Sequence, residues 1–220
     1  MNRVEIPNNS TSHNDGNNND DDGNHQIINN EYDNKINKCN NKRGCLLCEC
    51  VITSNIFHST STNRQYTSVI PINVAKVDCN TANCIYMITC SNCNLQYVGE
   101  TVQPLKRRFA KHREGLKHPE KDNTCRILSE HFNSPLCKGA SFKINILEKL
   151  CGDGRDKNGV VDSSITKIRR EKETKYMLQL RTVYPFGLND RIGNEYRSMS
   201  NLPIASYFFS TNKEKIIRCS

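Results

Sequence analysis

The residues with the most chemical potential lie between positions 84 and 113. Two tyrosines, Tyr86 and Tyr97, are eleven positions apart, and each sits in a short apolar run. A Cys-x-x-Cys separates the two runs, and an arginine and a histidine, Arg108 and His112, follow four positions apart. By itself, a pair of phenols is more often simple packing. These residues can act together only if the chain folds them onto neighbouring elements.

The two apolar runs predict a β-hairpin. Cys84–Thr89 and Leu95–Gly99 are rich in β-branched and aromatic residues, which favour strands. A turn at Ser91-Asn92 would pair Tyr86 directly with Tyr97 and Cys90 with Cys93. Both phenols would then share one face of the hairpin.

A basic helix is predicted directly after the hairpin, over Pro104–Leu116, because Pro104 suits a first helical turn. Arg108 and His112 are neighbours on one edge of this helix. Its buried stripe comprises Leu105, Phe109, His112 and Leu116. Its exposed basic residues, either a solvated face or a surface for a polyanion, are Lys106, Arg107, Lys111 and Arg113.

Further elements are predicted downstream: a helix over 125–132, a strand over 141–147 and a helix over 164–182. The last helix would bury one side, comprising Ile165, Ile168, Met177 and Leu180. Residues 51–78 predict irregular structure or short β segments. The expected fold is therefore α+β, with a three-stranded antiparallel sheet flanked by helices.

The 12 cysteines favour metal sites over disulfides, because the N-terminus lacks a secretory signal and we expect an intracellular protein. No apolar run is long enough for a membrane span. One zinc site would use Cys39, Cys45 and Cys48, with Cys79 or Cys50 as fourth ligand; the alternative is free surface thiols. A second site would use Cys90, Cys93, His131 and Cys137, with five residues between His131 and Cys137. A redox role is disfavoured, since the Cys-x-x-Cys lies between strands.

Charge and composition divide the chain. Residues 1–38 hold 12 asparagines, 3 basic and 7 acidic residues, and predict a disordered tail. The remaining residues hold 28 basic and 16 acidic ones, which favours a nucleic-acid partner over a basic protein without one. The expected divisions are a tail over 1–38, a cysteine-rich zinc segment over 39–82, a main domain over 83–190 and an extension over 191–220.

The order of these elements and motifs resembles the GIY-YIG nuclease family. Cys84-Ile85-Tyr86 matches its first motif, with Cys where the family name has Gly, and Tyr97-Val98-Gly99 matches its second. The segment from Lys106 to Phe109, with His112, is similar to its arginine-containing helix. Glu173 and Asn189 are similar to its late glutamate and asparagine. The resemblance covers residues 83–190.

The branch attached to Penelope-like retroelements is a closer match. It has cysteines between the two motifs, which match Cys90 and Cys93, and a downstream Glu-His, which matches Glu130-His131. It also has an upstream cysteine cluster, which matches Cys39, Cys45, Cys48 and Cys79. The strings YVGET and, from Leu180 to Asn189, L-x-T-x-x-P-x-G-L-N are specific. This resemblance implies a free-standing module or remnant of a mobile element, located in the nucleus, with a reverse transcriptase as a partner.

The resemblance implies roles for these residues in a DNA endonuclease, which we expect to nick. Tyr86 would be the general base, Arg108 would bind the scissile phosphate, and Glu173 would hold Mg²⁺ or Mn²⁺. Tyr97 would orient water or phosphate, His112 would shuttle a proton and Asn189 would support the site. Zinc would be structural, and the exposed basic residues of the helix would hold the DNA backbone. The alternative is a zinc-stabilised DNA-binding module without catalysis.

Overall fold

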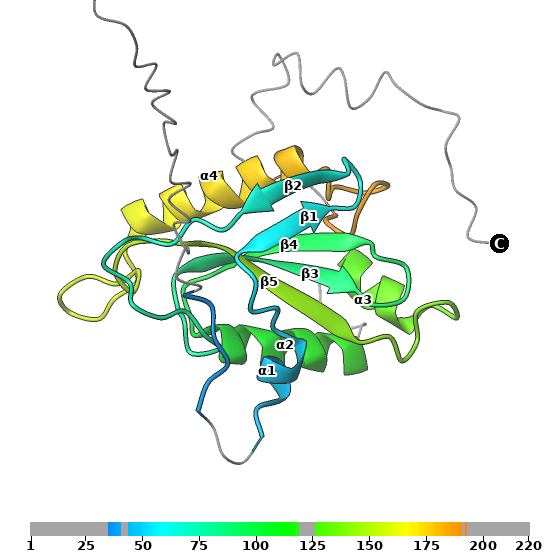
Figure 1. The fold of residues 1–220 in the computed structure, drawn as a ribbon, viewed down its shortest axis with the longest axis horizontal. Coiled ribbons are helices and arrows are strands. Elements are labelled where there is room, and N and C mark those ends of the chain that lie inside the picture. The colour runs from blue at the N-terminus through cyan, green and yellow to red at the C-terminus, as the bar shows by residue number, and fades with distance from the viewer. Residues whose placement is uncertain (1–34, 41–43, 119–125, 191, 193–220) are drawn as a thin grey trace, which may run out of the picture. The chain divides into compact units, whose positions relative to one another are not determined.

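A three-stranded antiparallel sheet forms the centre of the computed structural model, which describes residues 35–40, 44–118, 126–190 and 192. Its strands are β3 (Cys84–Cys90), β4 (Gln96–Thr101) and β5 (Phe142–Lys149), in the order β4-β3-β5. Figure 1 shows helix α2 on one side of this sheet and helix α4 on the other. The α+β fold with this sheet is as predicted. Within the described residues, no helix has the length and apolarity to cross a membrane.

The central strand β3 is buried along its whole length, because both faces of the sheet are covered. Tyr86 and Ile88 point into one core, together with Leu105 and Phe109 of α2 (Leu105–Lys117). On the opposite face, Ile85 and Met87 pack with residues of α4 (Ser163–Leu180), namely Tyr176, Met177 and Leu180. Alternation along β3 thus assigns Tyr86 to the face covered by the basic helix.

The hairpin register differs from the predicted one by two residues. Tyr86 pairs with Gly99, and Tyr97 pairs with Ile88. The connection is longer than expected because Asn94 adopts a left-handed conformation, with φ of 63°, and its N–H donates to the Cys90 carbonyl. A shift of two residues preserves the face on which each side chain lies, so Tyr86 and Tyr97 remain neighbours, now on a diagonal.

The strand β4 also continues beyond Gly99, which was predicted to end it, and reaches Thr101. Cys84, which replaces the first glycine of the family motif, lies in register with Thr101 on one side and Lys149 on the other. Its thiol is fully buried, and the pairing of β3 with β4 is continuous around it, whereas the pairing of β3 with β5 shifts register between Ile85 and Tyr86. The fold therefore accommodates the cysteine side chain at this position.

The face that α4 buries includes Met177 and Leu180, as predicted, but not Ile168. Asp162 caps the helix by accepting hydrogen bonds from the N–H groups of Ser164 and Ile165. Ile168, predicted to be buried, is 46% exposed, whereas the neighbouring Arg169 is only 2% exposed. A polar partner on the sheet draws Arg169 inward, as described below, and apolar periodicity alone does not reveal such a partner.

The cysteine-rich segment packs onto the same core as the sheet. It contains a short helix, α1 (Leu46–Cys50), and a two-stranded antiparallel sheet of β1 (Ile56–Ser59) and β2 (Arg64–Thr67). Irregular or short β structure was predicted for 51–78, but α1 was not expected. Of the expected terminal segments, 1–38 and 191–220, only residues 35–38 and 192 are described, and Ile36 is buried and pairs with Val77.

Candidate active site and metal centres

The hydroxyl of Tyr86 joins the two functional residues of helix α2. It lies 2.6 Å from Nε2 of His112, and Nε of Arg108 donates a hydrogen bond to it at 3.0 Å. Tyr86 and His112 are 1% and 4% exposed. Arg108 and His112, four residues apart on one face of α2, therefore both contact the Tyr86 oxygen, which the alternation of β3 directs toward that helix. This arrangement connects a group that can exchange protons to both an imidazole and a guanidinium.

Gly99 makes room for this arrangement. It is paired with Tyr86 across the hairpin, and a Cβ at Gly99 would lie 2.5 Å from the Tyr86 hydroxyl and 2.8 Å from Cε1 of Tyr97. A side chain of any size would displace one of the two phenols. The sequence predicted Gly99 only as the end of a strand. The signal for its spatial role was its place in the Tyr-Val-Gly motif.

Tyr97 and Asn189 complete the surroundings of Tyr86. The Tyr97 ring centroid lies 6.5 Å from that of Tyr86 and 5.6 Å from that of His112. The Asn189 side chain accepts a hydrogen bond from the Val98 N–H at 2.9 Å and donates one to the Val98 carbonyl at 2.7 Å. Asn189 thus pairs with the outer edge of β4 as a strand would, and fixes the residue between Tyr97 and Gly99.

A pocket of about 240 Å³ lies beside these residues. It brings Glu173 of α4 to the same cavity as Arg108 and Lys111 of α2, although Glu173 lies far along the chain. Tyr86 is not among the residues that line it, so Arg108 connects the pocket to the Tyr86 hydroxyl. The lining residues are Glu100, Thr101, Val102, Gln103, Arg108, Lys111 and Glu173.

The electrostatic environment of Glu173 suits a cation ligand. Burial, and after it the negative charge of Glu100, raise the pKa of Glu173 to about 7, although Arg108 opposes both effects. The main chain of Glu100 also lowers the pKa of the Glu173 carboxyl, by a smaller amount. An ionised Glu173 therefore lacks sufficient compensating charge in this pocket. A hard divalent cation such as Mg²⁺ or Mn²⁺ would supply it, so the carboxylate fits the predicted metal.

The four predicted DNA-binding residues of α2 are all exposed. Lys111 lines the pocket, whereas Lys106, Arg107 and Arg113 do not. The exposed basic face therefore extends from the pocket along the outside of the helix.

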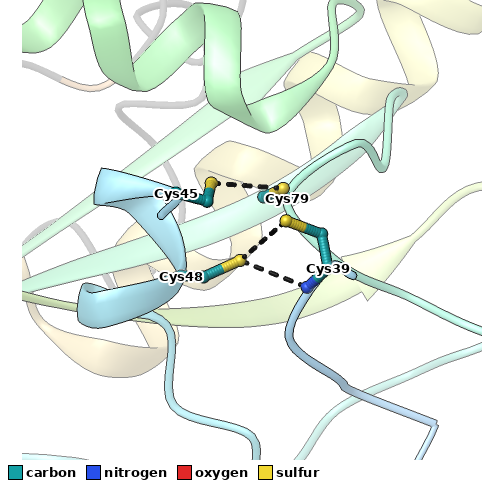
Figure 2. A group of neighbouring side chains, drawn as sticks. All are labelled: Cys39, Cys45, Cys48 and Cys79. Atoms are coloured by element: carbon teal, nitrogen blue, oxygen red, sulfur yellow. Dashed lines mark hydrogen bonds between the residues drawn. The ribbon is translucent and has the colours of Figure 1, made fainter. Parts of the chain in front are cut away.

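The first cysteine cluster unites Cys39, Cys45, Cys48 and Cys79, whose sulfur atoms all lie within 4.8 Å of one another. Figure 2 shows the four side chains turned toward one centre. The sulfurs of Cys48 and Cys39 are 3.3 Å apart, and those of Cys45 and Cys79 are 3.6 Å apart. Tetrahedral zinc with Zn–S bonds of about 2.3 Å requires sulfurs about 3.8 Å apart, so these four thiols fit zinc with small adjustments.

The fourth thiol of this cluster is thus that of Cys79, and the other candidate, Cys50, lies outside it. The Cys50 thiol donates instead to the carbonyl of Leu46. No disulfide joins the cysteines that the structure describes. Burial raises the pKa of the Cys48 and Cys79 thiols, which a bound dication would reverse by favouring the thiolates.

The second cluster contains Cys90, Cys93, His131 and Cys137, again with ligand atoms within 4.8 Å of one another. Sγ of Cys93 lies 3.4 Å from Nε2 of His131. Burial lowers the His131 pKa and thereby favours the neutral imidazole that a metal requires. His131 and Cys137 come together because α3 (Arg126–Asn133) ends just after His131 and a turn brings Cys137 back. This set also fits zinc.

Each cluster is connected to one end of α2. At the start of the helix, the Lys106 N–H donates to the Cys79 carbonyl at 2.8 Å. At its end, Ser129 and Asn133 of α3 donate to the carbonyls of Gly115 and Leu116. The cysteine clusters therefore lie where they can fix the helix that carries Arg108 and His112. Sequence spacing gave no indication of these links.

Comparison with protein-family models matches residues 82–150 to the GIY-YIG catalytic domain. This match supports a GIY-YIG domain in that part of the chain. The matched segment includes Tyr86, Tyr97, Arg108 and His112, while Glu173 and Asn189 lie outside it. This domain supports a nuclease-type function and does not favour a binding module without catalysis. No curated protein and no solved structure gives a match.

Proposed function

We propose that this GIY-YIG domain is a metal-dependent DNA endonuclease that nicks one strand, and that it derives from a Penelope-like retroelement. The observation that carries the activity is the Tyr86 hydroxyl, which contacts both His112 and Arg108 beside the pocket that contains Glu173. The retroelement origin, a reverse-transcriptase partner and a nuclear location rest on the sequence motifs alone.

The hydrogen bonds at Tyr86 support a hydrolytic step. A water oxygen forms a bond to phosphorus, and the bond from phosphorus to the leaving oxygen breaks. The water proton passes to the Tyr86 oxygen while Tyr86 gives its own proton to Nε2 of His112, 2.6 Å away. The leaving oxygen takes a proton from solvent. Arg108 neutralises charge on the phosphate and, through Nε, stabilises negative charge on the Tyr86 oxygen.

The carboxylate of Glu173 would hold the divalent cation. When bound, Mg²⁺ or Mn²⁺ would neutralise negative charge on the phosphate and on the leaving oxygen. Tyr97, packed against His112, limits the movement of the imidazole ring. Zinc at the two clusters has a structural role in this proposal.

The exposed basic residues of α2 would bind DNA phosphates on the pocket side of the helix. Such contacts position the duplex and carry no sequence information. We therefore expect salt-sensitive binding with little sequence preference from this surface.

Nicking of supercoiled plasmid by zinc-loaded protein in Mg²⁺ or Mn²⁺ tests the proposal. Glu173→Ala should abolish nicking. Glu171→Ala is the matched control, because Glu171 lies on the same helix but does not line the pocket. Equal nicking by the Glu173→Ala variant and the wild type would refute the proposal. Wild-type protein that binds DNA but never nicks it would establish the binding module instead.

A further inference from the structure

A buried arginine lies one helical turn before Glu173. Arg169 is 2% exposed, and all three of its guanidinium nitrogens are engaged. Nε donates to Oε2 of Glu100, Nη1 donates to Oδ1 of Asn83 at 3.1 Å, and Nη2 donates to Oγ1 of Thr166 at 3.3 Å. Removing a cation from water costs several kcal/mol unless a counter-charge and hydrogen bonds compensate it. Here Glu100 is that counter-charge.

Glu100 contacts α4 at two points. Its carboxylate binds Arg169, and the Glu100 main chain interacts with the Glu173 carboxylate and lowers its pKa. Arg169 and Glu173 are four residues apart and therefore lie on the same face of the helix. Glu100 also lines the pocket, with its side chain 23% exposed. One residue of β4 thus fixes both the helix and the orientation of its carboxylate.

We propose that Arg169 and Glu100 are a positioning pair that holds the Glu173 carboxylate in the pocket for cation binding. This inference rests on the proposed function, in which Glu173 is the cation ligand. Arg169 fixes the Glu100 side chain, and Glu100 fixes the distance between β4 and α4 at the pocket. Partners that orient a metal ligand in this way change metal affinity by about 10- to 100-fold when they are removed.

A second ion pair on the same helix provides a matched control. Nζ of Lys172 binds Oε1 of Glu148 at 2.5 Å and joins α4 to β5. Glu148 is buried, as is Arg169 of the first ion pair. Neither Glu148 nor Lys172 lines the pocket. Loss of this pair removes a similar link between helix and sheet without altering the surroundings of Glu173.

The test measures Mn²⁺ affinity by electron paramagnetic resonance on zinc-loaded full-length protein, below the melting temperature of each variant. The variants are Glu100→Gln, Glu100→Asp, Arg169→Met, the control Glu148→Gln and the reference Glu173→Gln. DNA affinity without divalent ions, and kcat and KM for nicking, are measured in parallel. Glu100→Asp keeps the charge but withdraws the carboxylate by one methylene, so it separates position from charge.

We expect Glu100→Gln, Glu100→Asp and Arg169→Met to weaken Mn²⁺ binding about 10-fold or more and to lower kcat, with DNA affinity unchanged. Glu148→Gln should bind Mn²⁺ as the wild type does. If Glu100→Gln binds Mn²⁺ with wild-type affinity while Glu173→Gln binds it more weakly, the positioning role of Arg169 and Glu100 is refuted and the proposed function stands. If Glu100→Asp alone binds Mn²⁺ as the wild type does, the charge of Glu100 and not its position supports cation binding, which contradicts the positioning role. Wild-type affinity in Glu173→Gln overturns both proposals.

Discussion

The hydroxyl of Tyr86 and Nε2 of His112 lie 2.6 Å apart, in a site where both residues are almost fully buried. The strand β3 and the helix α2 are thereby joined through a hydrogen bond that can transfer a proton. Because Arg108 donates to the same oxygen, the tyrosine is held by two residues of one helix.

Replacement of Tyr86 by Phe should lower the nicking rate by about 10²- to 10⁴-fold, the usual contribution of general acid–base catalysis. His112→Ala should have a similar effect. The double variant should be little worse than either single one, because the two residues act as a unit. Single-turnover nicking measures these rates. Tyr66→Phe is the control, since the Tyr66 hydroxyl binds the Gln179 carbonyl far along α4. Fully additive losses would contradict a coupled pair.

Replacement of Gly99 by Ala should abolish nicking, because the added Cβ would lie 2.5 Å from the Tyr86 hydroxyl. Overpacking of this kind costs about 1–3 kcal/mol of the free energy of unfolding. Gly159→Ala is the comparison: its φ of 77° makes a side chain strained, but no heavy atom lies within 4 Å. It should lose stability and retain nicking. Thermal melts and nicking assays of both variants separate the two effects, and an active Gly99→Ala protein would disprove this role of Gly99.

Replacement of Cys79 by Ser should remove one of two zinc ions per chain and lower the nicking rate. Cys79 contributes both a thiol to the cluster and the carbonyl that binds the Lys106 N–H at the start of α2. Zinc content by atomic emission and the thiolate-to-metal absorption of the Co²⁺-substituted protein report the site. Cys50→Ser makes the same chemical change outside the cluster and should leave both measurements unchanged. Wild-type zinc content in Cys79→Ser would exclude Cys79 as a ligand.

Mn²⁺ binding should weaken as the pH falls below 7. Burial and the charge of Glu100 raise the pKa of Glu173 to about 7, so below this pH its carboxyl is protonated and a cation must displace the proton. Apparent affinity should fall by about tenfold per pH unit in this range. In metal-free protein the same raised pKa makes stability fall as the pH rises from about 4.5 to 7, since only the folded chain retains the proton.

Mn²⁺ titrations from pH 5.5 to 8.5, with Glu173→Gln as the control, test this prediction. Removal of the titrating carboxyl should leave weak binding with little pH dependence. A wild-type affinity that is constant between pH 6 and 7 would show that Glu173 titrates well below this range.

Local sequence patterns were sufficient where neighbours along the chain decide the outcome. The strand pair, the basic helix and most members of the two cysteine clusters follow from alternation, helical periodicity and cysteine spacing. The hairpin register was wrong by two residues because the left-handed Asn94 lengthens the turn. The common face of Tyr86 and Tyr97 was nevertheless correct, since a shift of two residues preserves the side on which each lies.

The long-range polar contacts were not predictable in the same way. Ile168 was expected inside but is exposed, and the structure instead buries the neighbouring Arg169, for which Glu100 of β4 provides a counter-charge. The choice of Cys79 over Cys50 likewise depended on which thiol the fold brings to the cluster.

The sequence by itself determined the α+β fold, because strands and helices follow from residue identity and short spacings, and it supplied the candidate site residues and cysteine clusters through spacing and family resemblance. Only the tertiary structure decided that His112 and Arg108 meet at the Tyr86 oxygen, that Gly99 leaves room for it, and that Glu100 and Arg169 hold α4 at the pocket. Such contacts join residues far apart in the chain. Their geometry depends on how strands and helices pack, which no local pattern encodes.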